Sequence, residues 1–401
     1  MKILIVNKFL YPVGGAETYM FKLGEYLSSK GIEIQYFGME DERNIVGNDK
    51  GVYVKKIDFK SAKITDKIFY PFKLIYSFEA RNKIASVLDD FKPDIVHMNN
   101  INFQLTPSII YEIRRRKIPI VQTVHDPQIS CPNHRLYNEN EERICDKCLN
   151  GKYINCFKEK CLKNSRMASG IATIESYYYH KRNTYNLIDK YICPSEFISE
   201  IIKAGGIEEP RIEVLYNFSD NIEEVSLDNL KKDYVLYFGR LSTEKGIKTL
   251  LSACEKLTNI NFVIAGDGPL KKDINKLSNV KFLGFKSGDE LNKLIKEARF
   301  SVYPSEWYEN CPLSVIESKN LGTPVIVSDL GGAKELIKDG VTGLVFKGGE
   351  KQQLINSIER LWNNKELCNN MSKNCIKNRN NTIDIYFNNI IEIYNKIIRN
   401  N

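Results

Sequence analysis

The stretch WYENCPLSVIESKNLGTPVIVSD, residues 307–329, decides the fold of the second half of the chain. Residues 315–322 are predicted to belong to a helix, because the segment is partly apolar and ends immediately before a Thr-Pro pair. Residues 325–327 then form an apolar run typical of a buried strand. A loop, a helix and a buried strand in this order are typical of an α/β unit.

Glu309 and Glu317 lie eight positions apart in this stretch. Eight residues are a little over two helical turns, so one carboxylate falls in the loop and the other in the helix. We expect both to face one crevice, where ionised oxygens would accept short hydrogen bonds from sugar hydroxyls. The alternative is two solvated acids on a surface helix.

Two similar units precede this stretch. Residues 234–238 are an apolar run that ends in Gly239-Arg240 and is followed by LSTEKGIKTLL, which predicts a strand, a tight loop and a helix. Arg240 and Lys245 are expected at the carboxyl end of the strand, where an open α/β sheet binds ligands, and two cations there suit a diphosphate. The sequence FVIAGDGPLKKDI adds a glycine turn at Gly266 that allows close backbone approach to an anion. Alternatively, Arg240 pairs with a surface acid and the glycines serve the turn only.

Apolar strands alternate with amphipathic helices along the whole chain, which predicts parallel sheets with helices on both faces. The polar segment 217–233 separates two such blocks, so we expect two doubly wound domains. The predicted strands are 2–7, 32–37, 95–98, 120–124 and 190–193 in the first block, and 234–238, 261–265, 280–283, 300–303, 325–327 and 343–346 in the second.

FGRLSTEKG, AGDGP, the Glu309/Glu317 pair and GTPVIVSDLGGAKE, in this order, resemble the C-terminal half of retaining glycosyltransferases of family GT4. MKILIVNKFLYPVGGAETYMFKL, KPDIVHMNN and VQTVHDP resemble the N-terminal half, so the resemblance covers all but about 129–165. It implies the GT-B fold, an α/β architecture of two doubly wound Rossmann-like domains that face each other across a crevice. The expected parts are an acceptor-side domain 1–216 with an insert at 129–165, a donor-binding domain 217–378, and a C-terminal helix 379–401 that packs back on the first domain. An apolar stripe at Phe387, Ile391, Tyr394 and Ile398 permits that packing.

The resemblance also assigns the donor site. Arg240 and Lys245 match the pair that neutralises the diphosphate without a metal ion, Glu317 matches the ribose-binding carboxylate, and Glu309 matches the carboxylate at the donor sugar. Pro312 departs from the family, since many relatives have glycine there and proline lacks an N–H. The expected donor-binding residues are Gly15, Arg240, Lys245, Gly266, Phe285, Glu309, Cys311, Leu313 and Glu317.

His125 matches the family's histidine near the donor sugar, and the expected catalytic residues are therefore His125, Glu309, Arg240 and Lys245. A histidine at a strand end is alternatively a hydrogen-bonded core residue. Gly14, His97 and Asn99 are expected on the acceptor side. Glu17 reads as a first-turn helix acid and is not assigned a role in the site.

An insert between residues 131 and 161 holds five of the ten cysteines, with the spacing Cys131-x13-Cys145-x2-Cys148-x7-Cys156-x4-Cys161. Cys145, Cys148, Cys156 and Cys161 suit a structural zinc ion or an iron–sulfur centre. The alternative is a reduced, loop-rich excursion over the acceptor site. Disulfides are not expected, because no secretory signal is recognised.

Basic and aromatic residues are interleaved between Lys55 and Lys83, and residues 114–117 add a second basic block. With a net charge of +8, this pattern suits an anionic inner-leaflet surface, or alternatively a helix that packs on the first domain. No nucleic-acid module is recognised. No apolar run is long enough to span a membrane, so we expect a cytoplasmic enzyme, peripheral at most.

The expected function is transfer of a hexose from a UDP- or GDP-type nucleoside-diphosphate donor to a glycan or lipid-linked acceptor, typical of surface polysaccharide synthesis, with no cofactor required for catalysis. A nucleotide-sugar 2-epimerase on the same fold and a non-enzymatic, metal-stabilised interaction protein are the rivals. The donor base, the sugar and the acceptor are not readable from the sequence.

Overall fold

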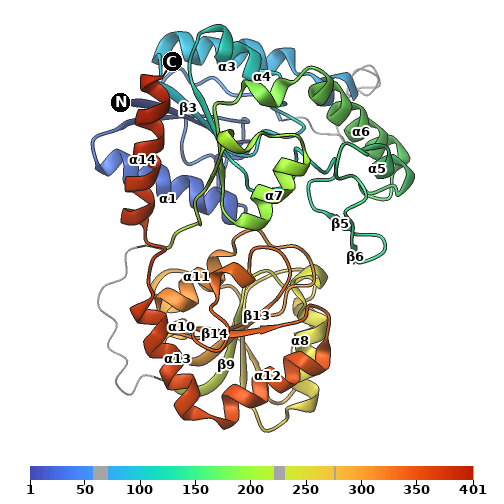
Figure 1. The fold of residues 1–401 in the computed structure, drawn as a ribbon, viewed down its shortest axis with the longest axis vertical. Coiled ribbons are helices and arrows are strands. Elements are labelled where there is room, and N and C mark those ends of the chain that lie inside the picture. The colour runs from blue at the N-terminus through green and yellow to red at the C-terminus, as the bar shows by residue number, and fades with distance from the viewer. Residues whose placement is uncertain (57–70, 221–230, 275–276, 401) are drawn as a thin grey trace. The chain divides into compact units, whose positions relative to one another are not determined.

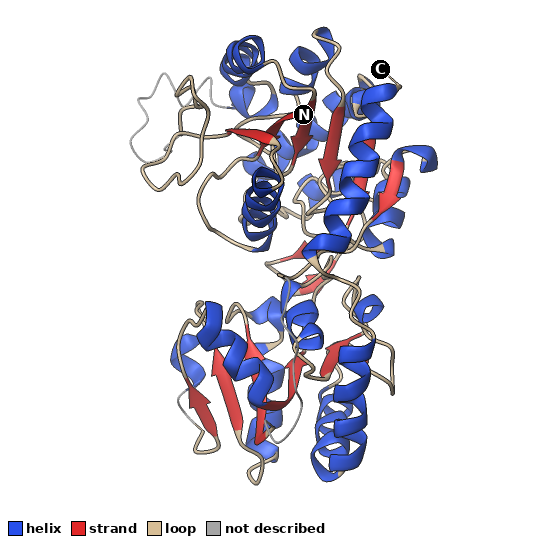
Figure 2. Cartoon of the chain, turned by 90° about the vertical axis from the view of Figure 1, so that its left-hand side faces the viewer, coloured by secondary structure: helices blue, strands red, loops and turns tan. Residues whose placement is uncertain are grey.

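Two six-stranded parallel sheets organise the chain (Figure 1). The structure, a computed structural model, describes residues 1–56, 71–220, 231–274 and 277–400. One unit comprises Met1–Glu141, Cys145–Tyr216 and Tyr386–Asn401, and the other comprises Glu142–Ile144 and Asn217–Ile385. Each sheet has helices on both of its faces (Figure 2), the layered arrangement that the alternation of strands and helices predicted.

The first sheet has the strand order β2-β1-β3-β4-β7-β8, and neighbouring strands run parallel. Its central strands are almost continuously buried, as expected for strands covered on both faces. The strands are β1 Lys2–Val6, β2 Glu33–Phe37, β3 Ile95–Met98, β4 Ile120–Thr123, β7 Lys190–Cys193 and β8 Ile212–Val214; the two-residue strands β5 Tyr137–Asn138 and β6 Arg143–Ile144 pair separately in the insert. The accompanying helices are α1 Gly15–Ser29, α3 Phe78–Phe91, α4 Ile109–Arg115, α5 Ile154–Lys158, α6 Arg166–Lys181, α7 Glu196–Ala204 and the 3₁₀ turns η1 Thr184–Leu187 and η2 Glu209–Arg211.

The second sheet has the order β11-β10-β9-β12-β13-β14 and is also parallel. Its core joins Val235, Phe262, Phe300 and Ile326 on the strands to Leu354 on the covering helix α12. The strands are β9 Lys232–Phe238, β10 Phe262–Ala265, β11 Val280–Phe282, β12 Ala298–Tyr303, β13 Val325–Ser328 and β14 Gly343–Phe346. The helices of this unit are α8 Ile247–Lys256, α9 Lys271–Ile274, α10 Gly288–Glu297, α11 Leu313–Asn320, α12 Lys351–Asn363, α13 Lys365–Lys377, η3 Thr243–Lys245 and η4 Lys334–Leu336. The last helix, α14 Ile383–Arg399, belongs to the first unit from Tyr386 onward.

The predicted strands all overlap observed ones, so the expectation of two doubly wound α/β blocks is confirmed. Sequence reasoning missed three short strands. β8 is an edge strand of three residues, and β5 and β6 have two each, too short to show a period.

Both sheets reverse their strand order at a definite place. In the first unit β1 lies between β2 and β3, so the order changes between β1 and β3. In the second unit it changes between β9 and β12. Loops at the carboxyl ends of these strands are where open α/β sheets bind ligands, because helices cross to opposite faces there and leave an opening.

Helix α14 packs within the first unit through tyrosines. The hydroxyl groups of Tyr386 and Tyr19 lie 2.6 Å apart, and the Tyr394 hydroxyl lies 2.5 Å from His97 Nδ1. The buried face carries Ile383, Tyr386, Ile390, Tyr394 and Ile397. The predicted stripe was wrong in register, because it shared only Tyr394 with this face. The buried face lies one position before the predicted stripe, which places the Tyr386 hydroxyl against Tyr19.

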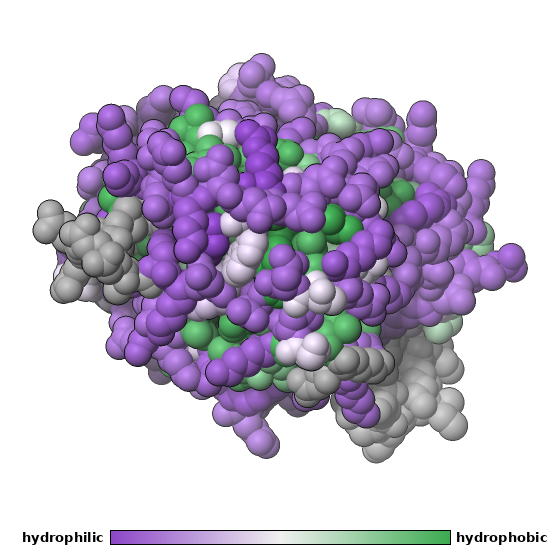
Figure 3. Space-filling model, turned by 90° about the horizontal axis from the view of Figure 1, so that it is seen from below, coloured by the Kyte–Doolittle hydropathy of each residue, from purple (hydrophilic) through white to green (hydrophobic). Residues whose placement is uncertain are grey.

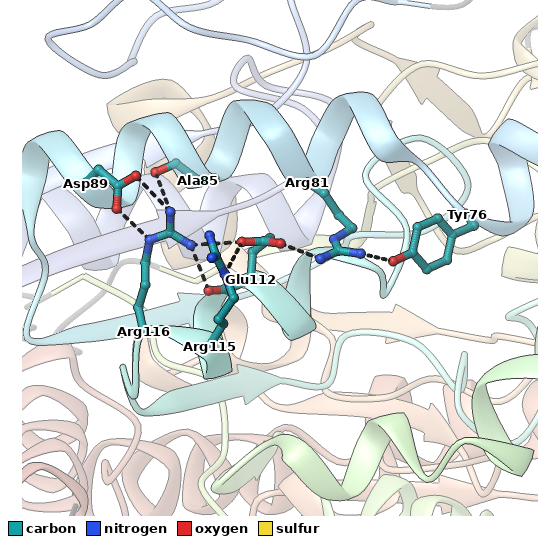
Figure 4. Close-up of polar contacts among 7 residues, drawn as sticks. All are labelled: Tyr76, Arg81, Ala85, Asp89, Glu112, Arg115 and Arg116. Carbon is teal, nitrogen blue, oxygen red and sulfur yellow. Dashed lines mark hydrogen bonds and ion pairs between the residues drawn. The ribbon is translucent and has the colours of Figure 1, made fainter.

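The arginines of the second basic block are tied into ion pairs of their own unit (Figure 4). Arg116 Nε lies 2.7 Å from Asp89 Oδ1, and Arg116 also bonds to the buried carboxylate of Glu112, as do Arg81 and Arg115. Arg114 pairs with Asp189 at 2.9 Å. The Arg81–Glu112 and Arg116–Asp89 pairs join α3 to α4. Together these pairs favour the packed-helix alternative over a bilayer contact for this block.

Part of the other basic segment, including Phe59, Ile68, Phe69 and Tyr70, lies outside the described residues. Within the part of the chain that the structure describes, no helix combines the length and the apolar character needed to cross a membrane. The face shown in Figure 3 is mostly hydrophilic, with its apolar groups in small separate patches.

Candidate functional site

Glu309 lies in the loop between β12 and α11, at the switch point of the second sheet, the place between β9 and β12 where the strand order reverses. Its side chain is buried, with 6% of the residue exposed. A single carboxylate oxygen, Oε1, accepts three hydrogen bonds: from Lys245 Nζ at 2.6 Å, from Ser305 Oγ at 2.6 Å and from Trp307 Nε1 at 2.5 Å. The donors come from two loops, one after β9 and one after β12, so the sheet order itself brings them together.

The charge of Glu309 is maintained against its burial. Desolvation disfavours the ionised form, but the Lys245 ammonium and the hydrogen bonds from Lys245, Ser305 and Trp307 outweigh it, so the pKa of Glu309 lies below its ordinary value. A carboxylate held this way accepts strongly and cannot drift toward the neutral acid at neutral pH. That suits a group that must receive hydrogen bonds from ligand hydroxyls.

Lys245 has a different environment from the one expected. It was predicted to bind a diphosphate beside Arg240, and in this structure its ammonium pairs with Glu309 and lies 3.0 Å from the Tyr303 hydroxyl. The ammonium also lies 5.2 Å from the centre of the Trp307 ring, within cation–π range. Arg240 is exposed, and no ion pair of its guanidinium is found among the described residues. The structure therefore unites Lys245 with Glu309 and leaves Arg240 facing solvent.

The glycine turns of this unit bring backbone segments into close contact. Gly266 has a φ of 148°, and a Cβ there would lie 1.9 Å from the Gly239 carbonyl oxygen. Gly331 has a φ of 67°, and a Cβ there would lie 2.2 Å from the Glu309 carbonyl oxygen. Any side chain at Gly331 would push away the loop that carries Glu309, so this glycine positions the carboxylate.

Helix α11 begins one residue after Pro312, which is its N-cap. Glu317 lies inside the helix and is partly exposed, so the predicted division, with one glutamate in the loop and one in the helix, is confirmed. Cys311 is buried, and its carbonyl oxygen accepts a hydrogen bond from Asn217 at 3.0 Å. Leu313 is the first residue of the helix, so its N–H has no partner within the helix and is available to a ligand. Pro312 has no N–H to offer.

Phe285 follows β11 and is 73% exposed. The preceding residue, Gly284, accepts a hydrogen bond from the Gly266 N–H at 2.8 Å, so Phe285 follows directly on the glycine turn. Its expected role is to stack on a nucleobase. That role remains a prediction.

In the first unit, Gly14 and Gly15 open helix α1, and both are exposed. The Gly14 N–H donates to Glu17 Oε2 at 3.1 Å, and Asn7 Nδ2 donates to Glu17 Oε1 at 3.1 Å. Glu17 is thus a capping residue of the helix that also holds the loop after β1, in agreement with its reading as a first-turn acid.

His125 lies at the end of β4, where Asn99 orients it. Its Nε2 is 2.8 Å from Asn99 Oδ1, so Nε2 carries the proton and donates, and Tyr19 packs edge-on against the ring at 5.0 Å. Burial lowers the pKa of His125 to about 3, which keeps the imidazole neutral. Asn99 is 1% exposed, so its side chain contacts His125 and presents no surface to an acceptor.

The expectation for His97 is corrected. It was placed on the acceptor side, but it is fully buried, with Nδ1 at 2.5 Å from Tyr394 and Nε2 at 2.7 Å from Thr123. Both ring nitrogens are occupied inside the core, because helix α14 covers this position of β3. His97 therefore joins α14 to the sheet.

Sequence reasoning missed Ser305, Trp307 and Tyr303, the residues that hold the Lys245–Glu309 pair. Ser305 and Trp307 stand within four positions of Glu309, so an acid flanked by side-chain donors was the available signal. Nothing local pointed to Tyr303, which ends a buried strand.

The five cysteines of the insert are buried free thiols. Cys148, Cys156 and Cys161 pack with Tyr153 and Leu162 in a small cluster. Burial and the neighbouring thiols of Cys131, Cys161 and Cys145 raise the pKa of Cys148. Among the described residues, no three His, Cys, Asp or Glu side chains are positioned to hold a metal ion. A metal would thus require some thiols to turn toward a common point.

Comparison with protein families places both halves of the chain. Residues 13–221 match the model described as Glycosyltransferase Family 4, and residues 218–378 match the model described as Glycosyl transferases group 1. The chain belongs to glycosyltransferase family 4. It is therefore an enzyme of the glycosyltransferase class, as the ordered motifs indicated.

Three curated relatives show how widely the similarity extends. An uncharacterized glycosyltransferase of Methanocaldococcus jannaschii is 27% identical over 93% of both chains, and an O-antigen chain mannosyltransferase C of Escherichia coli is 23% identical over 93% of this chain and 92% of its own. An alpha-D-kanosaminyltransferase of Streptomyces kanamyceticus is 32% identical, but over only 38% of this chain and 42% of its own length.

Among solved structures, the Anabaena protein HepE in complex with UDP is similar with a TM-score of 0.69 and 18% identity, over 99% of this chain and 100% of that one. At this identity the similarity concerns the fold. The expected GT-B fold is confirmed over the whole chain.

Proposed function

We propose that this family 4 glycosyltransferase transfers a hexose, with retention of configuration, from a nucleoside-diphosphate sugar to a hydroxyl group of a glycan or lipid-linked acceptor in polysaccharide synthesis. The observation that carries the proposal is the buried, ionised Glu309 held by Lys245 at the switch point of the second sheet. A desolvated carboxylate accepts hydrogen bonds from sugar hydroxyls with little competition from water.

Each part of the donor has a group suited to it. Arg240 is exposed and can move to the diphosphate, where a guanidinium forms paired hydrogen bonds with phosphate oxygens. Lys245 can share its ammonium between Glu309 and a phosphate oxygen, since it has three protons to donate. Glu317 suits the ribose hydroxyls, and Phe285 suits the base. These cations stabilise the leaving diphosphate, so catalysis is proposed to need no metal ion.

In the first unit, neutral His125 is proposed to hold a hydroxyl of the donor sugar, with Asn99 fixing its tautomer. No protein group is required as a covalent nucleophile, because the departing phosphate can take the acceptor proton on the same face. The UDP bound to HepE and the O-antigen chain that the Escherichia coli relative is named for favour UDP as the first donor nucleotide to test and a glycan as the acceptor.

A thermal-shift panel of UDP-, GDP- and ADP-sugars, each with and without EDTA, tests the proposal. A true donor stabilises the folded chain by mass action, and about 2.7 kcal/mol is expected at a hundredfold excess over Kd. Persistent stabilisation and turnover in EDTA are expected. Stabilisation by none of the nucleotide sugars would contradict the proposal, and release of a free 2-epimer without transfer would favour the epimerase.

A further inference from the structure

Polar side chains from four segments meet at the carboxyl edge of the first sheet. Lys8 follows β1, Asn102 lies in the loop after β3, Asp126 follows His125 at the end of β4, and His134 belongs to the cysteine insert. Asn102 Nδ2 donates to His134 Nδ1 at 2.8 Å and to Asp126 Oδ2 at 3.3 Å. The edge is the switch-point side of the sheet, where a ligand site is expected. The transfer chemistry proposed above uses none of the four.

The backbone around this cluster is strained at two stacked residues. Phe103 has a φ of 63° and His134 a φ of 64°, backbone angles that residues other than glycine rarely adopt. Their rings stack with centroids 4.8 Å apart and planes 17° from parallel. Strained conformations of this kind persist where the surrounding structure holds them, and they concentrate at binding sites. The stacked rings of Phe103 and His134 therefore join the insert to the loop after β3 at one defined point.

The cluster also holds polar atoms without partners. In the described chain, four buried side-chain atoms of these segments make no hydrogen bond: Asn102 Oδ1, Gln104 Oε1, Gln128 Nε2 and His134 Nε2. Because His134 Nδ1 accepts from Asn102, its Nε2 carries the proton and is an unused donor. The cluster itself thus holds one unused donor, His134 Nε2, and one unused acceptor, Asn102 Oδ1. Unpaired buried groups are costly, so a ligand that pairs them gains affinity.

The charges of the region indicate the kind of ligand. Burial lowers the pKa of Lys8, and the negative charges of Asp126 and Glu17 only partly offset this by raising it. Burial raises the pKa of Asp126 to about 6. A cation flanked by two carboxyl groups is a poor site for an anion, because the acids repel it. The same set offers both donors and acceptors to neutral hydroxyl groups, which can do both at once.

We propose that Lys8, Asn102, Asp126 and His134 form a subsite that binds adjacent hydroxyl groups of a neutral sugar, the accepting residue of the acceptor. Lys8, Asp126 and His134 are partly exposed, so a ligand can reach them. The inference rests on the proposed function, since only a glycosyltransferase has an acceptor sugar to hold. It assigns the insert a part in acceptor recognition, through His134, that does not depend on any metal.

The test is saturation-transfer NMR and titration of the full chain with the α-methyl glycosides of glucose, galactose and mannose, in the presence of UDP. His134→Phe keeps an aromatic ring on Phe103 and removes both ring nitrogens. Asp126→Asn keeps the shape and removes the charge. His180→Phe is the matched control, because His180 also lies against an aromatic ring, Tyr153 at 4.8 Å, but on helix α6.

We expect at least one glycoside to bind the wild type and both subsite variants to weaken its binding by about tenfold or more, with the control unchanged. Equal glycoside affinity in wild type and both variants would overturn the subsite. So would a wild type that binds UDP but none of the glycosides, or displacement of the glycoside by inorganic phosphate.

Misfolding and failure of the proposed function have separate readouts. A variant counts only if UDP stabilises it as it does the wild type; if His134→Phe fails that check, the isosteric Asp126→Asn decides. Absence of stabilisation of the wild type by both UDP and GDP would count against the proposed function, whereas the glycoside titrations alone judge the subsite.

Discussion

Lys245 Nζ and Glu309 Oε1 lie 2.6 Å apart, although 64 positions separate the two residues in the chain. The ammonium that the motif assigns to phosphate is thus engaged by the carboxylate that the motif assigns to sugar. A donor that binds here must then either separate Lys245 from Glu309 or form its hydrogen bonds to them while the pair stays intact. The pair is largely screened from water, since the Lys245 and Glu309 side chains are 17% and 8% exposed.

Lys245→Met should cost both stability and activity. Glu309 would stay buried without its cation, and breaking such a pair costs about 3–5 kcal/mol. We expect this loss in the free energy of unfolding measured in urea, together with a fall in kcat/KM of about two to three orders of magnitude. The double variant Lys245→Met/Glu309→Gln should recover most of the stability and none of the activity. A single variant as stable as the wild type would show that the pair contributes no net stability.

Arg240→Ala should behave differently, because the side chain is exposed. The free energy of unfolding should change by no more than about 0.5 kcal/mol. In contrast, kcat/KM should fall by about two to three orders of magnitude if the guanidinium reaches the diphosphate. Arg240→Lys keeps the charge but loses the planar guanidinium, so its kcat/KM should lie between those of the wild type and Arg240→Ala. Near-wild-type turnover of the alanine variant would remove Arg240 from the donor site.

The two glutamates should separate in calorimetric titrations. Glu317→Ala is expected to weaken binding of free nucleotide and of nucleotide sugar alike, because the ribose is common to both. Glu309→Gln is expected to weaken mainly the nucleotide sugar, because its hydrogen-bond partners on the ligand belong to the sugar. Comparable loss of free-nucleotide affinity in both variants would be inconsistent with this division.

Glu309 should make stability depend on pH in acid. Its pKa in the folded chain lies below the ordinary value of 4.5, so between the two values the unfolded chain binds the extra proton. Its contribution is therefore fully present above about pH 4.5 and is lost as pH falls through the folded pKa. Urea unfolding of wild type and Glu309→Gln from pH 7 downward measures it. The difference in unfolding free energy should shrink in acid; a difference that grows would reverse the sign of the shift.

The cysteine insert remains a prediction. If Cys145, Cys148, Cys156 and Cys161 hold a metal, purified protein should contain about one zinc per chain, or show the brown absorbance of an iron–sulfur centre. Cys148→Ser should release it and expose the insert to proteolysis, because the cation offsets the cost of ionising buried thiols. Cys254→Ser, a buried cysteine of the second unit, is the control. A metal-free chain with a protease-resistant insert would identify the thiols as packing residues.

Much of the fold followed from local patterns. Apolar runs bounded by glycine and proline located the principal strands of both sheets, and the spacing of Glu309 and Glu317 placed them in a loop and a helix. These features depend on residues within one or two turns of each other, so sequence order contains them. The GT4 motifs stand in loops directly after strands, and their position at the sheet edge follows for the same reason.

The contacts of those residues depended on strand order and on which helix covers which strand. His97 and Tyr394 are 297 positions apart, and nothing near His97 announces that a C-terminal helix will cover it. Lys245 and Glu309 likewise meet because β12 pairs with β9. His134 meets Asn102 because the insert folds back onto the loop after β3. By itself the sequence determined the family, the two α/β blocks and the loops that carry the chemistry. Only the tertiary structure decided which charges pair and which histidine is buried, because those outcomes depend on desolvation by segments distant in the chain.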